Sequence, residues 1–104
     1  MVQLIALLHP SEDLDAVPLS QINRETVTQL GLAYELDVGS NDALEATPIM
    51  VDNTLFFTST FSIVHAVDAA TGVELWRYDP EVPRDFLRKA CCGPINRGVS
   101  VYEG

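Results

Sequence analysis

The sequence predicts an all-β chain that contains one antiparallel sheet of four strands. Runs rich in β-branched and aromatic residues flank two turn signals, the pair Asp52-Asn53 and the segment at residues 68–72. Asp, Asn and Gly tolerate the positive φ angles of tight turns, so each signal reverses the chain between neighbouring strands. With 104 residues and an apolar share of 47%, the chain has the size of one small domain or part of one.

Composition and charge exclude some classes of function. Fifteen acidic residues against six basic ones give a formal charge of −9, so nucleic acid is not expected as a partner. The apolar start at residues 1–8 is too short to span a bilayer and lacks the basic region and cleavage site of a signal peptide. No transmembrane segment or export signal is therefore predicted, and residues 1–17 are assigned no role.

Two elements are expected before the sheet. Asn23 is a suitable N-cap and Gly31 a suitable C-cap for a short helix at residues 24–30. Residues 32–38 then alternate apolar and polar side chains, and this period of two predicts a half-buried strand.

The first half of the sheet is predicted as a hairpin. Residues 44–51 have an apolar end that is typical of a strand, and residues 54–59 resume with β-branched and aromatic side chains. Asp52-Asn53 lies between them and provides the two-residue turn.

The second half of the sheet follows directly. A third strand is expected at residues 61–67 and a fourth at residues 73–78. In the connection, Asp68 is expected to fold back on the backbone of the turn, and Gly72 supplies its positive φ. After the sheet, residues 84–90 have helical character, and residues 99–102 are expected to begin a new strand.

The two cysteines of the chain, Cys91 and Cys92, are adjacent. Neighbouring Cα atoms lie about 3.8 Å apart, less than the roughly 4.4–6.8 Å of a relaxed disulfide, so a bond between these cysteines would close a strained ring. Gly93 and Pro94 favour a turn directly after them. We interpret this stretch as a ligand platform; the alternative is that the cysteines are reduced, buried, small apolar side chains.

Two motifs carry a resemblance to a known family. Cys91-Cys92-Gly93-Pro94-Ile95-Asn96-Arg97-Gly98-Val99 resembles the Cys-Cys-x-x-x-Asn-Arg-Gly-Val segment of the PQQ-dependent (quinoprotein) alcohol and methanol dehydrogenases. In that family a vicinal disulfide lies flat against pyrroloquinoline quinone (PQQ). Ala66-x-Asp68-x-x-Thr71-Gly72-x-x-x-Trp76 is similar to the tryptophan-docking motif of quinoprotein propellers, in which the indole packs between neighbouring blades.

The resemblance covers residues 18–104 and implies a fold. The expected architecture is the first blade and the start of the second blade of an eight-bladed quinoprotein β-propeller, preceded by the unassigned segment 1–17. The N-terminus is then expected to be incomplete and the C-terminus to stop inside the domain. Trp76 is expected to be partly exposed, because the blade against which it would dock is not in the chain.

The resemblance also implies a cofactor site. A disulfide between Cys91 and Cys92 would supply the flat face for PQQ, and Arg97 the cation for its carboxylates. In the family the glutamate of the Glu-Ala-Thr-Pro phrase reaches the cofactor, and here this residue is Glu45. Because a carboxylate beside a polyanion is repelled unless a guanidinium lies between them, Glu45 and Arg97 are expected to lie within roughly 10–12 Å of one another. Gly93 departs from the family, which often has an acidic residue after the second cysteine.

The implied activity of the parent protein is oxidation of an alcohol by hydride transfer to the quinone, assisted by calcium or a lanthanide ion. A cytochrome c or a fused haem domain would accept the electrons, and the location would be periplasmic, a compartment that permits disulfides. The metal ligands and the catalytic aspartate of the family lie downstream of residue 104. No catalytic residue and no metal site is therefore expected in residues 1–104, and this stretch alone is expected to be inactive.

Two other classes of function remain as alternatives. A non-enzymatic propeller, acting as an envelope scaffold that binds protein, shares the tryptophan-docking motif but does not explain an adjacent cysteine pair followed by Arg97. A small thiol redox protein would require Cys-x-x-Cys spacing and a βαβ order, and the sequence shows neither.

Overall fold

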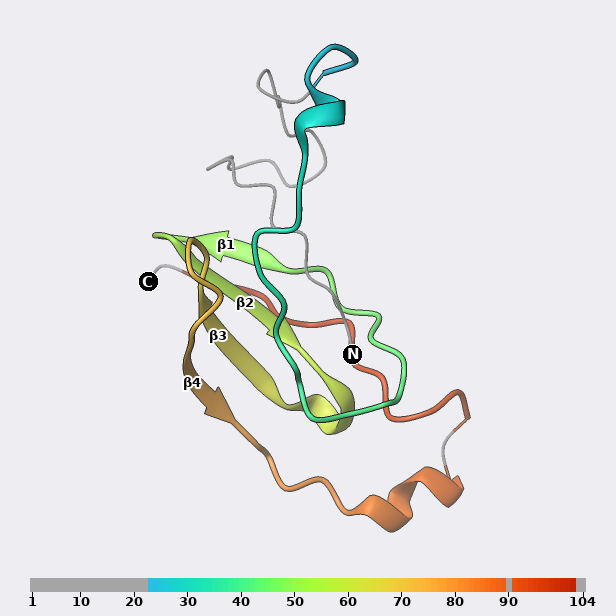
Figure 1. The fold of residues 1–104 in the computed structure, drawn as a ribbon. Coiled ribbons are helices and arrows are strands. Elements are labelled where there is room, and N and C mark those ends of the chain that lie inside the picture. Colours follow the sequence, from blue (N-terminus) through green and yellow to red (C-terminus); the bar gives the residue numbers. More distant parts are fainter. Residues whose placement is uncertain (1–22, 90, 103–104) are drawn as a thin grey trace.

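The computed structural model describes residues 23–89 and 91–102, and these form a single antiparallel sheet of four strands in the order β1-β2-β3-β4 (Figure 1). The prediction of an all-β chain is therefore confirmed. The segment 1–17, to which no role was assigned, lies outside the described residues. The strands are β1 (Ile49–Val51), β2 (Thr54–Thr58), β3 (Val64–Asp68) and β4 (Glu74–Tyr78).

The predicted turn between β1 and β2 has the expected backbone. Asp52 and Asn53 have φ angles of 46° and 59°, in the left-handed region that short polar side chains tolerate. Val51 pairs directly with Thr54, so the hairpin turn consists of two residues. Of the predicted strand 44–51, only the apolar end pairs in the sheet.

The turn between β3 and β4 also agrees with the prediction. The Asp68 carboxylate accepts hydrogen bonds from the amide and hydroxyl of Thr71 and from the amide of Ala70. The bonds from Thr71 contribute most to lowering the pKa of Asp68 below its ordinary value. Gly72 has a φ of 75°, and a methyl group at this position would overlap the ring of Tyr34. Glycine is thus required here by both conformation and space.

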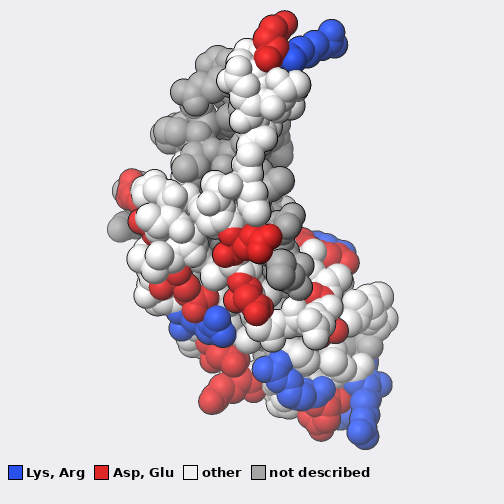
Figure 2. Space-filling view, in the orientation of Figure 1, with Lys and Arg blue, Asp and Glu red and all other residues white. Residues whose placement is uncertain are grey.

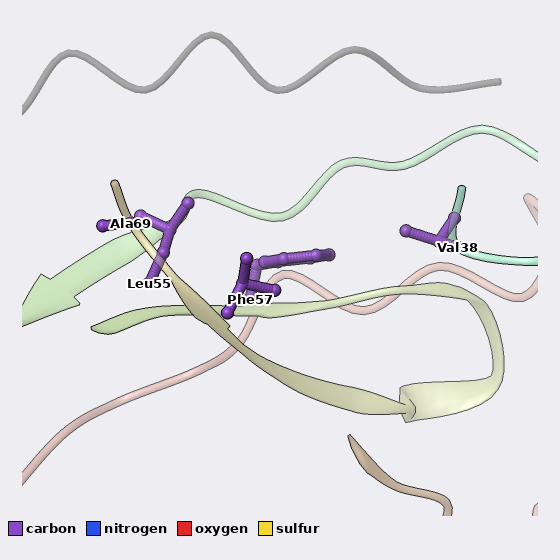
Figure 3. Close-up of a cluster of buried hydrophobic side chains, with 5 residues drawn as sticks. Val38, Leu55, Phe57 and Ala69 are labelled. Atoms are coloured by element: carbon purple, nitrogen blue, oxygen red, sulfur yellow. The ribbon is translucent and has the colours of Figure 1, made fainter. Parts of the chain in front are cut away.

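The hydrophobic core lies on one face of the sheet. Leu55 and Phe57 of β2 share this face with Val67 of β3, since Leu55 pairs with Val67. Val38 and Ala69 complete the buried cluster, which Figure 3 shows around β2. Partly buried side chains from the segment before and into β1 pack against it: Leu36, Leu44, Ala46 and Met50. The segment before β1 therefore packs over this face of the sheet through Leu36, Leu44 and Ala46.

The opposite face carries Trp76. Trp76 of β4 pairs with Ala66 of β3, which pairs in turn with Phe56 of β2. The rings of Phe56 and Trp76 lie 5.9 Å apart between centroids, and Trp76 remains 49% exposed. The expected partial exposure of Trp76 is confirmed, and its docking role stays a prediction.

A partly buried polar network, which the sequence did not predict, joins β3 and β4 to Ser59, the residue that follows β2. His65 of β3 is fully buried and stacks on Phe57 with a centroid distance of 4.9 Å. Its Nε2 lies 2.7 Å from the Ser59 hydroxyl, and its Nδ1 lies 2.7 Å from the Glu74 carboxylate. Arg77 donates to the same carboxylate over 3.1 Å. No buried side-chain nitrogen or oxygen of these residues lacks a hydrogen-bond partner, which offsets the cost of burial.

The predicted helix at residues 24–30 is reduced to a single turn, the 3-10 helix η1 (Val27–Gln29). The prediction of Asn23 as N-cap is wrong, since Thr26 occupies that position and makes no side-chain cap bond. The Asn23 Oδ1 instead accepts hydrogen bonds from the amides of Glu25 and Thr26 in the turn that precedes the helix. The prediction of Gly31 as C-cap is wrong, since Leu30 ends the helix in an extended conformation. Three successive β-branched residues, 26–28, disfavour a longer helix.

The strand predicted at residues 32–38 is also wrong as a strand, although its alternation is real. The segment makes only an isolated bridge at Leu36. Leu36 and Val38 nevertheless point into the core while Glu35 and Asp37 are exposed. The alternation arises because the segment lies across the face of the sheet, rather than pairing along its edge.

The remaining differences concern the ends of elements. The third strand begins at Val64 rather than at residue 61, because Thr60–Ser62 forms the 3-10 turn η2. The helical character at residues 84–90 is confirmed as the 3-10 helix η3 (Arg84–Lys89); Ala90 lies outside the described residues. Residues 99–102 do not form the expected strand, since no described strand pairs with them.

We predict that replacing Glu74 with Gln will lower stability and remove part of its pH dependence. Burial raises the pKa of Glu74, but hydrogen bonds from His65 and Arg77 together with their charges outweigh it, so the pKa lies below its ordinary value of 4.5. A depressed pKa stabilises the fold above the pKa of the unfolded state, and this stabilisation is lost as pH falls below 4.5 through the folded pKa.

Urea unfolding at neutral pH should show a loss of about 1 kcal/mol in Glu74→Gln, because a charge-assisted bond becomes a neutral one. The difference from wild type should shrink in acid. Glu81→Gln is the matched control, since Glu81 is exposed and its carboxylate makes no hydrogen bond or ion pair with the described residues. Equal pH profiles for all three proteins would contradict the prediction.

Candidate functional site

The segment that holds the cysteines returns to the end of β2 and to η2. After β4 the chain passes through η3 and runs back alongside the sheet (Figure 1). The amide of Phe61 in η2 donates to the carbonyl of Pro94 over 2.9 Å, and the Asn96 side chain donates to the Ser62 hydroxyl over 2.9 Å. Residues more than 30 positions apart in sequence are therefore in contact.

The other end of the same segment also contacts η2. The guanidinium carbon of Arg84, at the start of η3, lies 3.7 Å from the centroid of the Phe61 ring. This is a cation–π contact, which adds attraction beyond simple packing. The turn η2 thus contacts both sides of the segment that carries Cys91 and Cys92.

Glu45 and Arg97 meet directly. Nη2 of Arg97 donates to Oε2 of Glu45 over 2.6 Å, although the residues are 52 positions apart. The side chains are 74% exposed for Arg97 and 41% exposed for Glu45. The expected proximity of these two residues is confirmed, and the ion pair lies at the surface, where it is accessible to a ligand.

Both cysteines are exposed, so the alternative that they are buried apolar side chains is wrong. In the structure they are free thiols, and the disulfide between Cys91 and Cys92 stays a prediction. Cys92 and Gly93 have φ angles of 75° and 85°, so the chain turns sharply directly after the pair. A φ of 85° favours glycine, which accounts for Gly93 where the family often has an acidic residue.

The electrostatics of Cys92 connect the cysteines to the ion pair. A hydrogen bond with Cys91 raises the pKa of the Cys92 thiol, partial desolvation and the negative charge of Glu45 raise it further, and the positive charge of Arg97 lowers it. Cys92 therefore lies within electrostatic range of both charged residues. A raised pKa leaves Cys92 protonated at neutral pH, whereas thiol redox enzymes need a lowered one.

The four predicted site residues consequently lie in one region: Glu45, Cys91, Cys92 and Arg97. Two residues that hold this region were missed by the sequence analysis. In the sequence, Thr58 is an ordinary strand residue, and Asn96 is a member of the cysteine motif without a role of its own. In the structure, both side chains form hydrogen bonds with the backbone around Arg97. No local sequence signal identifies such long-range contacts.

In the part of the chain that the structure describes, no group of three or more His, Cys, Asp or Glu side chains is placed to hold a metal ion. No helix among the same residues has the length and apolar character needed to cross a bilayer. Figure 2 shows acidic and basic side chains interspersed on the face displayed, without a continuous basic surface over the described residues.

Comparison with known proteins gives a family match. The family described as "Glucose/ethanol/alcohol dehydrogenase, beta-propeller domain" matches residues 15–104. The chain is 48% identical over 87 residues to the 1-butanol dehydrogenase (cytochrome c) of Thauera butanivorans, which covers 84% of this chain and 13% of that protein. It is 42% identical over 86 residues to the quinohemoprotein alcohol dehydrogenase of Comamonas testosteroni, covering 83% and 12% respectively.

Solved structures give the same result. The crystal structure of the Comamonas testosteroni quinohemoprotein alcohol dehydrogenase matches with a TM-score of 0.78 and 42% identity over 81% of this chain and 12% of that chain. A quinohemoprotein alcohol dehydrogenase from Pseudomonas putida HK5 matches with a TM-score of 0.75 and 47% identity over 84% of this chain and 13% of that chain. The chain thus spans 12–13% of the length of the relatives it matches.

We predict that mild oxidation will join Cys91 to Cys92. Both thiols are exposed and adjacent, so each can lose its hydrogen to an added disulfide oxidant such as oxidised glutathione. The bond should be reduced more readily than a structural disulfide, because the short Cα separation strains the ring. Intact mass measurement should show the loss of two hydrogen atoms, with thiol labelling abolished.

The single variant Cys91→Ala is the control, since its remaining thiol has no partner in the same chain. Under the same treatment it should form only a mixed disulfide with glutathione. A wild-type chain that accumulates the mixed disulfide without ring closure would rule out the predicted bond.

Proposed function

The chain belongs to the PQQ-dependent (quinoprotein) alcohol dehydrogenase family, and from this premise we propose that its complete protein oxidises an alcohol with PQQ as cofactor. The four-stranded sheet is accordingly part of a β-propeller domain. The observation that carries the proposal is the convergence of the exposed cysteine pair with the Arg97–Glu45 ion pair.

The described residues fit a flat, polyanionic cofactor. Such a group needs a face to lie on and a cation for its carboxylates. Cys91 and Cys92 are exposed, and the guanidinium of Arg97 makes only one hydrogen bond within the described residues, to Glu45. Several of its N–H donors therefore remain available for a carboxylate of the cofactor.

Each of these residues has a distinct role in the proposal. The Cys91–Cys92 pair, joined as a disulfide, provides the face against which the ring system lies. Arg97 binds a carboxylate of the cofactor, and Glu45 orients the guanidinium by holding one of its N–H groups. Glu45 is kept from repelling the cofactor because Arg97 lies between the two negative charges.

The chemistry that PQQ would supply when bound is that of a two-electron acceptor for the hydride of the alcohol, assisted by a calcium or lanthanide ion. The residues of this chain bind and orient; the base that deprotonates the alcohol and the metal ligands are proposed to lie elsewhere in the protein. By itself the chain is proposed to be inactive. The names of the relatives, which include "cytochrome c" and "quinohemoprotein", support a cytochrome c or a fused haem domain as electron acceptor. A periplasmic location is proposed as well, since it would preserve the disulfide.

The direct test removes the cysteine face in the complete protein. The double variant Cys91→Ala, Cys92→Ala should weaken PQQ binding by at least about tenfold, or ~1.4 kcal/mol, because the cofactor loses its contact surface. Binding is measured by titrating PQQ into the apo-protein and following the quenching of tryptophan fluorescence. Alcohol oxidation with an artificial acceptor should fall in parallel.

Arg88→Ala is the matched control, since it removes an exposed side chain of η3 without touching the site. Wild-type affinity and turnover in the double variant would show that the cysteines provide no face for the cofactor. A wild-type protein that binds no PQQ would instead support the alternative of a non-enzymatic propeller that binds protein.

A second prediction separates the roles of Arg97 and Glu45. Arg97→Met should weaken PQQ binding by roughly ten- to a hundredfold, from the ~1.5–3 kcal/mol of hydrogen bonds to a charged group. Glu45→Gln should have a smaller effect, because the cation remains and only its orientation is loosened. The same fluorescence titration measures both, with circular dichroism as the control for folding. A larger loss in Glu45→Gln than in Arg97→Met would contradict the assigned roles.

A further inference from the structure

The hydroxyl of Thr58 contacts the backbone on both sides of Arg97. It donates to the carbonyl oxygen of Asn96 over 2.9 Å and to that of Gly98 over 2.8 Å. A threonine hydroxyl has a single hydrogen, so the two carbonyls share it. Thr58 is only 4% exposed, so water does not compete strongly for these bonds. One buried side chain of β2 thereby fixes the carbonyls that flank Arg97.

The Asn96 side chain also constrains the backbone of residues 96–98. Its Oδ1 accepts a hydrogen bond from the amide of Gly98 over 2.6 Å, and its Nδ2 donates to the Ser62 hydroxyl over 2.9 Å. A methyl group added at Gly98 would lie 2.9 Å from that Oδ1, which is too close for an ordinary contact. The Asn96 side chain thus bonds to the backbone on the far side of Arg97 and also attaches this segment to η2.

The turn that receives these contacts is itself strained. Phe61 and Ser62 have φ angles of 57° and 60°, a region that costs free energy for residues with side chains. The amide of Phe61 donates to Pro94, and the Ser62 hydroxyl accepts from Asn96. Strained backbone persists where its surroundings over-determine it, and such positions concentrate at functional sites.

The end of β2 is also held by contacts of Ser59, the residue that follows Thr58. The amide of Ser59 donates to the carbonyl of Ile63 over 2.8 Å, and its hydroxyl contacts the buried ring of His65. Thr58 therefore extends from a strand end that is held on both sides. A rigid support of this kind determines the position of a neighbouring functional group more precisely than a loop alone.

We infer that Thr58, together with Asn96, is a positioning residue that fixes the backbone of Arg97 and directs its guanidinium toward a carboxylate of the bound cofactor. The inference rests on the proposed function, because it assumes that Arg97 binds an anionic group of PQQ. Thr58 and Asn96 do not touch the cofactor in this arrangement. They act through Arg97, whose side chain is otherwise 74% exposed and held only by Glu45 among the described residues.

A merely structural role for Thr58 makes a different prediction from a positioning role. If Thr58 only stabilises the fold, its loss lowers the stability and affects the cofactor equally whether or not Arg97 is present. If Thr58 acts through Arg97, its effect on affinity disappears once Arg97 is removed, because the two residues then form one coupled unit.

The experiment uses the complete protein with its cofactor removed, and PQQ as the probe at a fixed calcium concentration. Thr58→Val keeps the shape but removes the hydroxyl, while Thr58→Ser keeps the hydroxyl. Thr54→Val is the matched control, because Thr54 lies on the same strand and face and its hydroxyl bonds to none of the described residues. Each variant is also made in the Arg97→Met background.

Thr58→Val should weaken PQQ binding by about two- to tenfold, the effect of one net hydrogen bond. Thr58→Ser and Thr54→Val should remain within about twofold of wild type, since both keep the Thr58 hydroxyl bond. In the Arg97→Met background, Thr58→Val should cause no further loss. Amide hydrogen exchange of the peptide that spans residues 94–99 should be faster in Thr58→Val without cofactor, which is a readout independent of activity.

Equal affinity in wild type and Thr58→Val would overturn the inference, as would an undiminished effect in the Arg97→Met background. If Thr58→Val does not fold, Ser62→Ala provides the same test, because it removes only the acceptor for the Asn96 side chain. It should likewise weaken PQQ binding in the presence of Arg97 and not in its absence. A wild-type protein without affinity for PQQ would overturn the proposed function itself, whereas failure of the variants alone would leave that function standing.

Discussion

The hydrogen bonds from the Thr58 hydroxyl to residues 96 and 98 are the interaction on which the site depends. They join the end of a central strand to a loop that is 38 to 40 positions away in sequence. The loop is also attached to η2, through the carbonyl of Pro94 and the side chain of Asn96. The position of Arg97, and with it the meeting of Arg97 and Glu45, follows from the attachment of this loop to the sheet.

The same strand end explains why polar residues are buried in so small a sheet. Thr58, Ser59 and Thr60 are all buried, and burial of hydroxyl groups costs free energy unless they are hydrogen-bonded. Thr58 meets this requirement through the loop, and Ser59 meets it through His65. No buried side-chain nitrogen or oxygen of the described residues lacks a partner. The same hydrogen bonds therefore satisfy the buried hydroxyl of Thr58 and attach the loop to the sheet.

The features that could be predicted from the sequence are those that depend on interactions between residues close together in the chain. The turns at Asp52-Asn53 and at Gly72 follow from local backbone preferences, and the structure has the expected φ angles at both. Strands 32–38 and 99–102 were wrong, because a strand requires a partner that no local pattern specifies. Glu45 and Arg97 were paired through a resemblance and a charge argument. Thr58 and His65 escaped notice, since their partners are distant in sequence or on neighbouring strands.

The exposed ion pair of Arg97 with Glu45 and the less exposed hydrogen bonds to the backbone around Arg97 have different functions. An ion pair as exposed as that of Arg97 with Glu45 is worth only about 0–1 kcal/mol, because water and salt screen it. It is therefore too weak to hold the loop, and the partly buried bonds of Thr58 and Asn96 do so. A guanidinium whose backbone is fixed but whose side chain is only weakly held can take up a new carboxylate without disturbing the loop. This division between a rigid backbone and an exchangeable side-chain partner is what a binding site for an anionic cofactor requires.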